Sequence, residues 1–97
     1  MMTNEEIKAK EAQGFKRWTK GDYDRLYINT YQVPGVETRW QKNGKKLIAI
    51  NGTELSYTKT AAVSYAKIYI DVKSGDVVVD TKDGAIKAQL EELVKAM

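Results

Sequence analysis

The chain has 97 residues, of which 42% are hydrophobic and 30% are charged, and its formal net charge is +3 at pH 7. This length and composition predict one globular domain spanning residues 1–97. Histidine and cysteine are both absent, which excludes disulfides, thiolate or imidazole catalysis and cysteine-rich zinc sites. We therefore expect a protein that is not an enzyme, needs no cofactor or metal, and acts by binding.

The first element expected along the chain is a helix. Thr3 and Glu6 form a capping-box pattern, so the helix should begin at about Asn4 and end near Gly14. The first residues are polar and acidic, unlike a secretory signal, and the longest apolar run, 47–50, is too short to cross a bilayer. We therefore expect a cytoplasmic protein without a membrane segment.

The next part of the chain predicts a meander of strands. Residues 23–31 alternate in polarity, as a strand does. One face of this strand would hold Tyr23, Arg25, Tyr27, Asn29 and Tyr31, and the other Leu26 and Ile28. A Pro-Gly turn at 34–35 leads to a strand over 37–42, and Asn43-Gly44 predicts a tight hairpin with a strand over 45–50. A short strand at 53–55 should fold back on it.

The second half predicts a helix, a hairpin and a helix. Ser56 is a candidate cap for a short helix over 57–66. Alternation over 67–72 and three valines at 77–79 predict a hairpin whose second strand is covered on both faces. Thr81 or Asp83 would cap the last helix, whose apolar stripe is Ile86, Leu90, Leu93, Val94 and Met97. The expected fold class is α+β, with a mostly antiparallel sheet of about five strands and the C-terminal amphipathic helix packed on one face.

Basic and aromatic residues are concentrated in the first half of the chain. Between Phe15 and Lys46 there are eight Lys and Arg residues against three acidic ones, and six of the nine aromatic residues. Such residues can pair with phosphates, stack on bases or contact a partner protein. The alternative is structural, because Tyr and Trp favour strands and edge lysines prevent aggregation. The candidate binding residues are Lys16, Arg17, Trp18, Lys20, Tyr23, Arg25, Tyr27, Arg39, Lys42, Lys45 and Lys46.

Charged residues at two turns allow further interpretations. Lys42, Lys45 and Lys46 around the expected Asn43-Gly44 turn could form a basic finger, or only a solubilising loop tip. Asp22 and Asp24 could bind Mg²⁺ from one face of a strand, although ion pairing with Lys20 or Arg25 is the simpler interpretation.

The second hairpin and the last helix each carry a weaker pattern. Acidic residues surround the hairpin without the spacing of a calcium loop, and are interpreted as turn or cap residues. They are Asp71, Asp76, Asp80 and Asp83. Ala85, Ala88 and Ala96 give the last helix a smooth flank, which could support a homodimer.

Two segments carry a family resemblance. Residues 16–29, with Lys16-Arg17-Trp18 and Asp24-Arg25-Leu26, and residues 66–72 resemble small uncharacterised proteins of bacteriophages and mobile elements. This resemblance implies a bacterial cytoplasm and a partner that is a host protein or a protein–nucleic-acid complex. Inhibition of a defence nuclease, in the manner of an anti-CRISPR protein, is one version. The alternatives are direct, weakly sequence-specific DNA or RNA binding and, third, a carboxylate-dependent enzyme.

Overall fold

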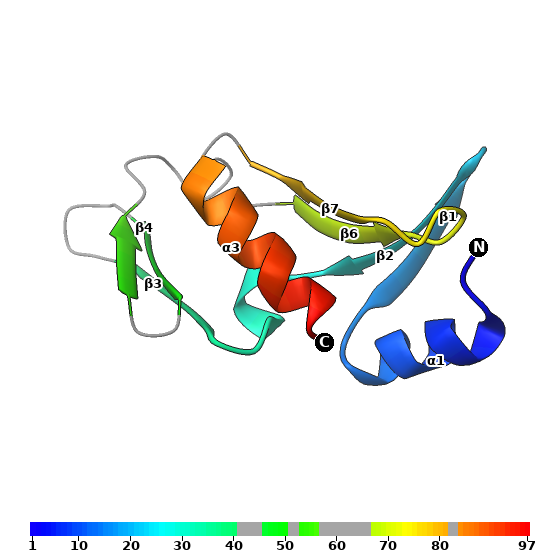
Figure 1. Ribbon diagram of the computed structural model, residues 1–97, viewed down its shortest axis with the longest axis horizontal. Helices are drawn as coiled ribbons and strands as arrows, with labels where there is room; N and C mark the ends of the chain where they lie inside the picture. The colour runs from blue at the N-terminus through cyan, green and yellow to red at the C-terminus, as the bar shows by residue number, and fades with distance from the viewer. Residues whose placement is uncertain (41–45, 51–52, 57–66, 82–83) are drawn as a thin grey trace.

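The computed structural model describes residues 1–40, 46–50, 53–56, 67–81 and 84–97 (Figure 1). The fold belongs to the α+β class, as predicted, with helices at both ends of the chain and antiparallel strands between them. Its elements are α1 (Asn4–Ala12), β1 (Lys16–Lys20), β2 (Tyr23–Ile28), the 3₁₀ helix η1 (Thr30–Gln32), β3 (Val36–Trp40), β4 (Lys46–Ile50), β5 (Thr53–Ser56), β6 (Lys67–Asp71), β7 (Val77–Asp80) and α3 (Gly84–Lys95).

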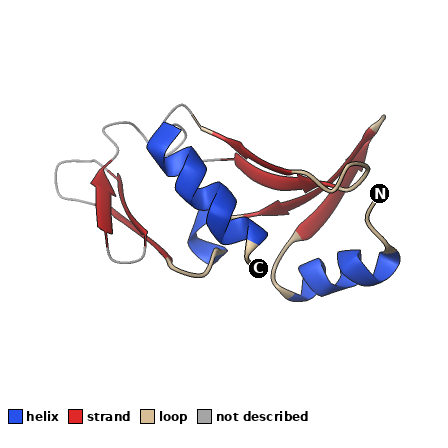
Figure 2. Ribbon diagram, in the orientation of Figure 1, coloured by secondary structure: helices blue, strands red, loops and turns tan. Residues whose placement is uncertain are grey.

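The described strands form two sheets, where the sequence predicted one. The larger has the order β1-β2-β6-β7 and the smaller the order β3-β4-β5, and Figure 2 shows the two groups of strands apart. After β2 the chain turns through η1, where Thr30 is buried, and then enters the smaller sheet at β3. Strand β2 pairs with β6 instead of continuing into a meander with β3.

Helix α1 begins where its cap predicts. The Glu6 amide donates to Thr3 Oγ1 at 3.2 Å, and the Thr3 amide donates to Glu6 Oε1 at 3.0 Å. The helix buries Ile7, and Ile7 belongs to the core on one face of the four-stranded sheet. The capping box therefore sets the first turn of the helix, from which Ile7 reaches the core.

Helix α3 covers the same face of the sheet as α1 and packs on β7 (Figure 1). Its residues Ile86, Leu90 and Val94 are buried, as the stripe predicted. They meet buried side chains that the strands direct to this face: Leu26, Ile28, Ile68, Ile70 and Val79. We call this the inner face of the sheet, and the opposite one the outer face.

Several sequence predictions differ from the structure in detail. The strand predicted over 23–31 ends at Ile28, and β1 was not predicted as a strand. Phe15, counted among the candidate aromatics, is 2% exposed and lies in the core. The expected covering of the valine strand on both faces is incomplete: Val79 on the inner face is buried, but Val77 on the inner face and Val78 on the outer face are only half-buried. The turn at 43–44, the helix over 57–66 and the cap at 83 lie outside the described residues.

Candidate binding surface

The register of β1, β2 and β6 gathers the aromatic and basic side chains on the outer face. Lys16, Trp18 and Lys20 of β1 lie opposite Tyr27, Arg25 and Tyr23 of β2. Tyr27 in turn lies opposite Tyr69 of β6. Side chains of directly opposed residues share a face, and the residues between them on β2 and β6 lie on the inner face. The ring-bearing residues with Arg25 form what we call the outer-face cluster: Trp18, Tyr23, Arg25, Tyr27 and Tyr69.

Arg25 is the centre of the cluster. Its guanidinium carbon lies 4.3 Å from the ring centroid of Tyr23 and 4.2 Å from that of Tyr69, so tyrosines flank it as cation–π partners. Its Nη1 donates to Tyr27 Oη at 2.9 Å. That hydrogen bond is the main cause that raises the pKa of Arg25 above its ordinary value, and the guanidinium stays charged.

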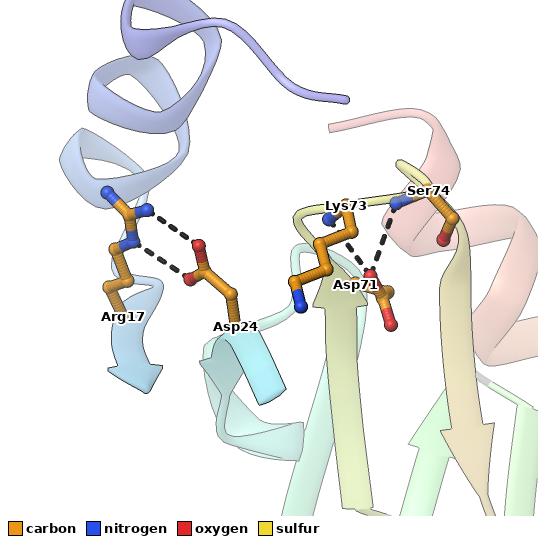
Figure 3. Close-up of polar contacts among 5 residues, drawn as sticks. All are labelled: Arg17, Asp24, Asp71, Lys73 and Ser74. Atoms are coloured by element: carbon orange, nitrogen blue, oxygen red, sulfur yellow. Dashed lines mark hydrogen bonds and ion pairs between the residues drawn. The ribbon is translucent and has the colours of Figure 1, made fainter. Parts of the chain in front are cut away.

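The donors of Arg25 are only partly used. Its Nε is buried and has no hydrogen-bond partner among the described residues. Asp71 is its register partner on β6, but the Asp71 carboxylate accepts the amides of Lys73 and Ser74 at 2.9 and 3.2 Å instead (Figure 3). Within the described part of the chain, Arg25 thus presents a positive charge that no carboxylate pairs.

The rings of the cluster contact one another. Trp18 stacks on Tyr23 with centroids 6.3 Å apart and an interplanar angle of 25°, and meets Tyr27 edge-on at 6.0 Å. The ring centroids of Tyr27 and Tyr69 lie 5.2 Å apart. Trp18 is nevertheless 41% exposed and Tyr23 55% exposed. The cluster therefore holds large apolar rings in fixed positions that water still reaches.

The end of the cluster at the β1–β2 turn is hollowed. Trp18, Lys20, Gly21, Asp22 and Tyr23 line a shallow hollow that is open to solvent. Gly21 has φ of 56°, in the left-handed region, which the two-residue turn needs and which glycine adopts without strain. The hollow is therefore lined by the rings of Trp18 and Tyr23 and by the charged residues Lys20 and Asp22.

An ion pair fixes β1 to β2 on the inner face. Arg17 Nε and Nη2 donate to the two carboxylate oxygens of Asp24 at 2.9 and 2.7 Å, as a fork (Figure 3). This bond is the largest cause that lowers the pKa of Asp24 below its ordinary value. Bidentate pairs of this kind fix geometry as well as charge.

The proposed pair of metal-binding carboxylates is not assembled. Asp24 is occupied by Arg17, which is the ion pair that forms in place of the ones expected with Lys20 or Arg25. Asp22 lies in the turn and is exposed. Among the described residues, no group of three Asp, Glu, His or Cys side chains is arranged to hold a metal ion.

The other predicted site residues fall in different places. Arg39 and Lys46 belong to β3 and β4 of the smaller sheet, apart from the cluster, and Lys42 and Lys45 lie outside the described residues. Tyr31 is 58% exposed but sits on η1, beyond the end of β2. Sequence reasoning missed Tyr69, although the alternation of 67–72 that assigns Ile68 and Ile70 to the core also assigns Tyr69 to the opposite face.

Comparison of the chain with protein-family models, with curated proteins and with solved structures gives no match. No helix in the described part of the chain is long and apolar enough to span a membrane. The geometry of the outer face is therefore the feature from which a function can be inferred.

Proposed function

We propose that the chain is a non-enzymatic binding protein that contacts a host protein, or a protein–nucleic-acid complex, through its outer face. One observation carries this proposal: Trp18 and Tyr23 remain exposed while the strands and Arg25 hold their rings in place. Trp, Tyr and Arg are the residues that most often dominate the binding energy of protein interfaces.

The rigidity of the cluster supports the proposal. Immobilising a flexible side chain on binding costs about 0.5–1.5 kcal/mol, and rings already packed on one another avoid part of that cost. No carboxylate among the described residues pairs with the charge of Arg25, and this charge favours an acceptor or carboxylate on the partner. The absence of His and Cys from the sequence agrees with a binding role.

The resemblance of residues 16–29 and 66–72 to mobile-element proteins supplies the setting for this proposal. The partner would be a component of a bacterial cytoplasm. Inhibition of a defence nuclease, as anti-CRISPR proteins do, is one form of it, with the outer face covering a surface that the nuclease needs.

The test is capture of the partner with matched variants. Purified chain is immobilised and exposed to nuclease-treated extract of the native host, alongside Trp18→Ala/Tyr23→Ala and the control Tyr31→Ala. Tyr31 is as exposed as Tyr23 but lies on η1. We expect one host protein to be retained by the wild type and the control and lost by the double variant. A retained set that is identical for all three chains would contradict the proposal.

Direct nucleic-acid binding is the second candidate, because Lys16 and Lys20 are exposed on the same face as Trp18. Proteins bind single-stranded nucleic acid with cationic side chains that contact the phosphates and aromatic rings that stack on the bases. Its affinity for oligothymidine should fall steeply with salt, since each phosphate contact releases counterions. Affinity that is flat between low and physiological salt would exclude this candidate.

A further inference from the structure

Strand β1 is an open edge of the larger sheet. It is the first strand in the order β1-β2-β6-β7, and every one of its residues is exposed. The strand at the other edge, β7, lies against α3. An exposed edge strand can accept a strand from another chain, whose main-chain hydrogen bonds provide affinity.

The backbone groups of Thr19 and Arg17 face this open edge. The Val72 amide donates to the Asp24 carbonyl at 2.9 Å, so the Asp24 backbone is directed toward β6 and away from β1. Thr19, the register partner of Asp24, is then in a non-hydrogen-bonded pair, and its own amide and carbonyl point outward. Pairs alternate along an antiparallel ladder, so Arg17 has the same orientation.

The charges of β1 select the kind of strand that fits. Lys16 and Lys20 flank Trp18 on the outer face, and β1 itself contains no acidic residue. Opposed like charges on neighbouring strands are destabilising and opposite charges are stabilising. A second copy of β1, paired about a two-fold axis at Trp18, would set Lys16 against Lys20. A strand with acidic residues two positions on either side of an apolar residue places each acid opposite a lysine.

We propose that the partner contributes an extended acidic strand, of the pattern acidic–x–apolar–x–acidic, that pairs antiparallel with β1. The apolar residue lies on Trp18 beside the hollow, and the two intervening residues bond to the backbone of Arg17 and Thr19. This inference rests on the proposed function and names the chemistry of the segment that the partner supplies.

The first experiment uses synthetic peptides. The probe is the heptapeptide G-E-T-V-T-E-G with blocked ends, and its controls are G-K-T-V-T-K-G and G-E-P-V-P-E-G. The prolines occupy the positions that face Arg17 and Thr19, so they remove the donors of the added ladder without changing the charge. We expect the probe to bind at least about tenfold more tightly than either control, a difference of about 1.4 kcal/mol. No binding of the probe, or equal binding of the proline peptide, overturns the inference.

The second measurement is amide hydrogen exchange of the full chain with and without the probe. The amides of Arg17 and Thr19 should become about tenfold or more protected, while those of Lys16, Trp18 and Lys20, already bonded to β2, should change much less. Binding of the probe without protection at Arg17 and Thr19 would place it elsewhere and overturn the inference. So would oligothymidine binding by a chain that ignores the probe, or a dimer whose own β1 edge is protected.

A third arm separates this inference from the proposed function. Thr19→Pro removes the outward amide, and Thr19→Ala is its control; edge strands tolerate proline where the amide faces solvent. If Thr19→Pro loses the captured host protein and Thr19→Ala retains it, strand pairing is supported. If Thr19→Pro retains it while Trp18→Ala/Tyr23→Ala loses it, the rings are used without the edge and only this inference fails. If both retain it, the proposed function fails as well.

Discussion

The contact between Trp18 and Tyr23 yields the sharpest prediction about the free protein. Their centroid distance of 6.3 Å and angle of 25° lie in the range where aromatic pairs contribute about 0.5–1.5 kcal/mol beyond buried area. Because the residues are 41% and 55% exposed, we expect the lower half of that range. A double-mutant cycle of Trp18→Ala and Tyr23→Ala should therefore give a coupling energy of about 0.5–1 kcal/mol.

The assay is urea unfolding followed by far-ultraviolet circular dichroism, since one variant removes a fluorescent tryptophan. Unfolding free energies come from linear extrapolation for the wild type, the single variants and the double variant. The matched control is the cycle of Trp18→Ala with Tyr31→Ala, whose rings lie on β1 and η1. That cycle should give a coupling within about 0.3 kcal/mol of zero.

Equal coupling in the two cycles would refute the reasoning. It would mean that Trp18 and Tyr23 are not held together before binding. The proposed function would then lose the rigidity from which it is argued, although the outer face would still be exposed.

Three further predictions concern stability. Leu90 is fully buried on α3, so Leu90→Ala should lower the unfolding free energy by about 2–5 kcal/mol in urea denaturation. The exposed control Lys87→Ala should change the unfolding free energy by less than about 0.5 kcal/mol, and equal effects of the two variants would contradict the described core. Because the pKa of Asp24 is lowered in the folded chain, its stabilising effect is present above the ordinary value of 3.8 and is lost as the pH falls below it. The stability gap between the wild type and Asp24→Asn, followed by thermal unfolding across this range, should therefore shrink in acid, and a constant gap would disprove the role of Arg17. Gly21→Ala should cost about 1–2 kcal/mol at its φ of 56°, while Gly21→Asn should cost less, because Asn tolerates this region; a larger loss for Asn would contradict the turn.

The sequence was sufficient wherever a local pattern determines local structure. The Thr3–Glu6 capping box requires only neighbouring residues, and it placed the start of α1 correctly. The alternation over 23–31 placed Leu26 and Ile28 on one face of the strand, and the structure buries both of them in the core. Such patterns report which side of an element is buried, but not which element buries it.

The pairing of strands and the composition of the cluster depended on distant contacts. Nothing near β2 in the sequence indicates that Tyr27 will lie opposite Tyr69 of β6. The predicted meander followed the usual preference of consecutive strands for pairing. In the structure the chain turns through η1, where Thr30 is buried, and β3 joins the smaller sheet instead of pairing with β2. The cluster was therefore predicted with Trp18 and its three β2 residues, but without Tyr69.

Strand β1 was not predicted because its residues are exposed, and the same exposure leaves its edge open to a partner strand. Both of its faces are exposed, so burial imposes no alternation on its sequence. Within the described part of the chain, β1 is held against β2 by the Gly21 turn, the Arg17–Asp24 pair and the contacts of Trp18. All of these act on the faces of the hairpin or on the side toward β2, and none of them uses the outward backbone of Thr19. A partner strand could therefore add its ladder there without displacing a contact. Binding should then slow amide exchange in the β1–β2 hairpin more than in the core beneath α3. A ligand stabilises the folded state most strongly in the region that it contacts and that opens most easily without it.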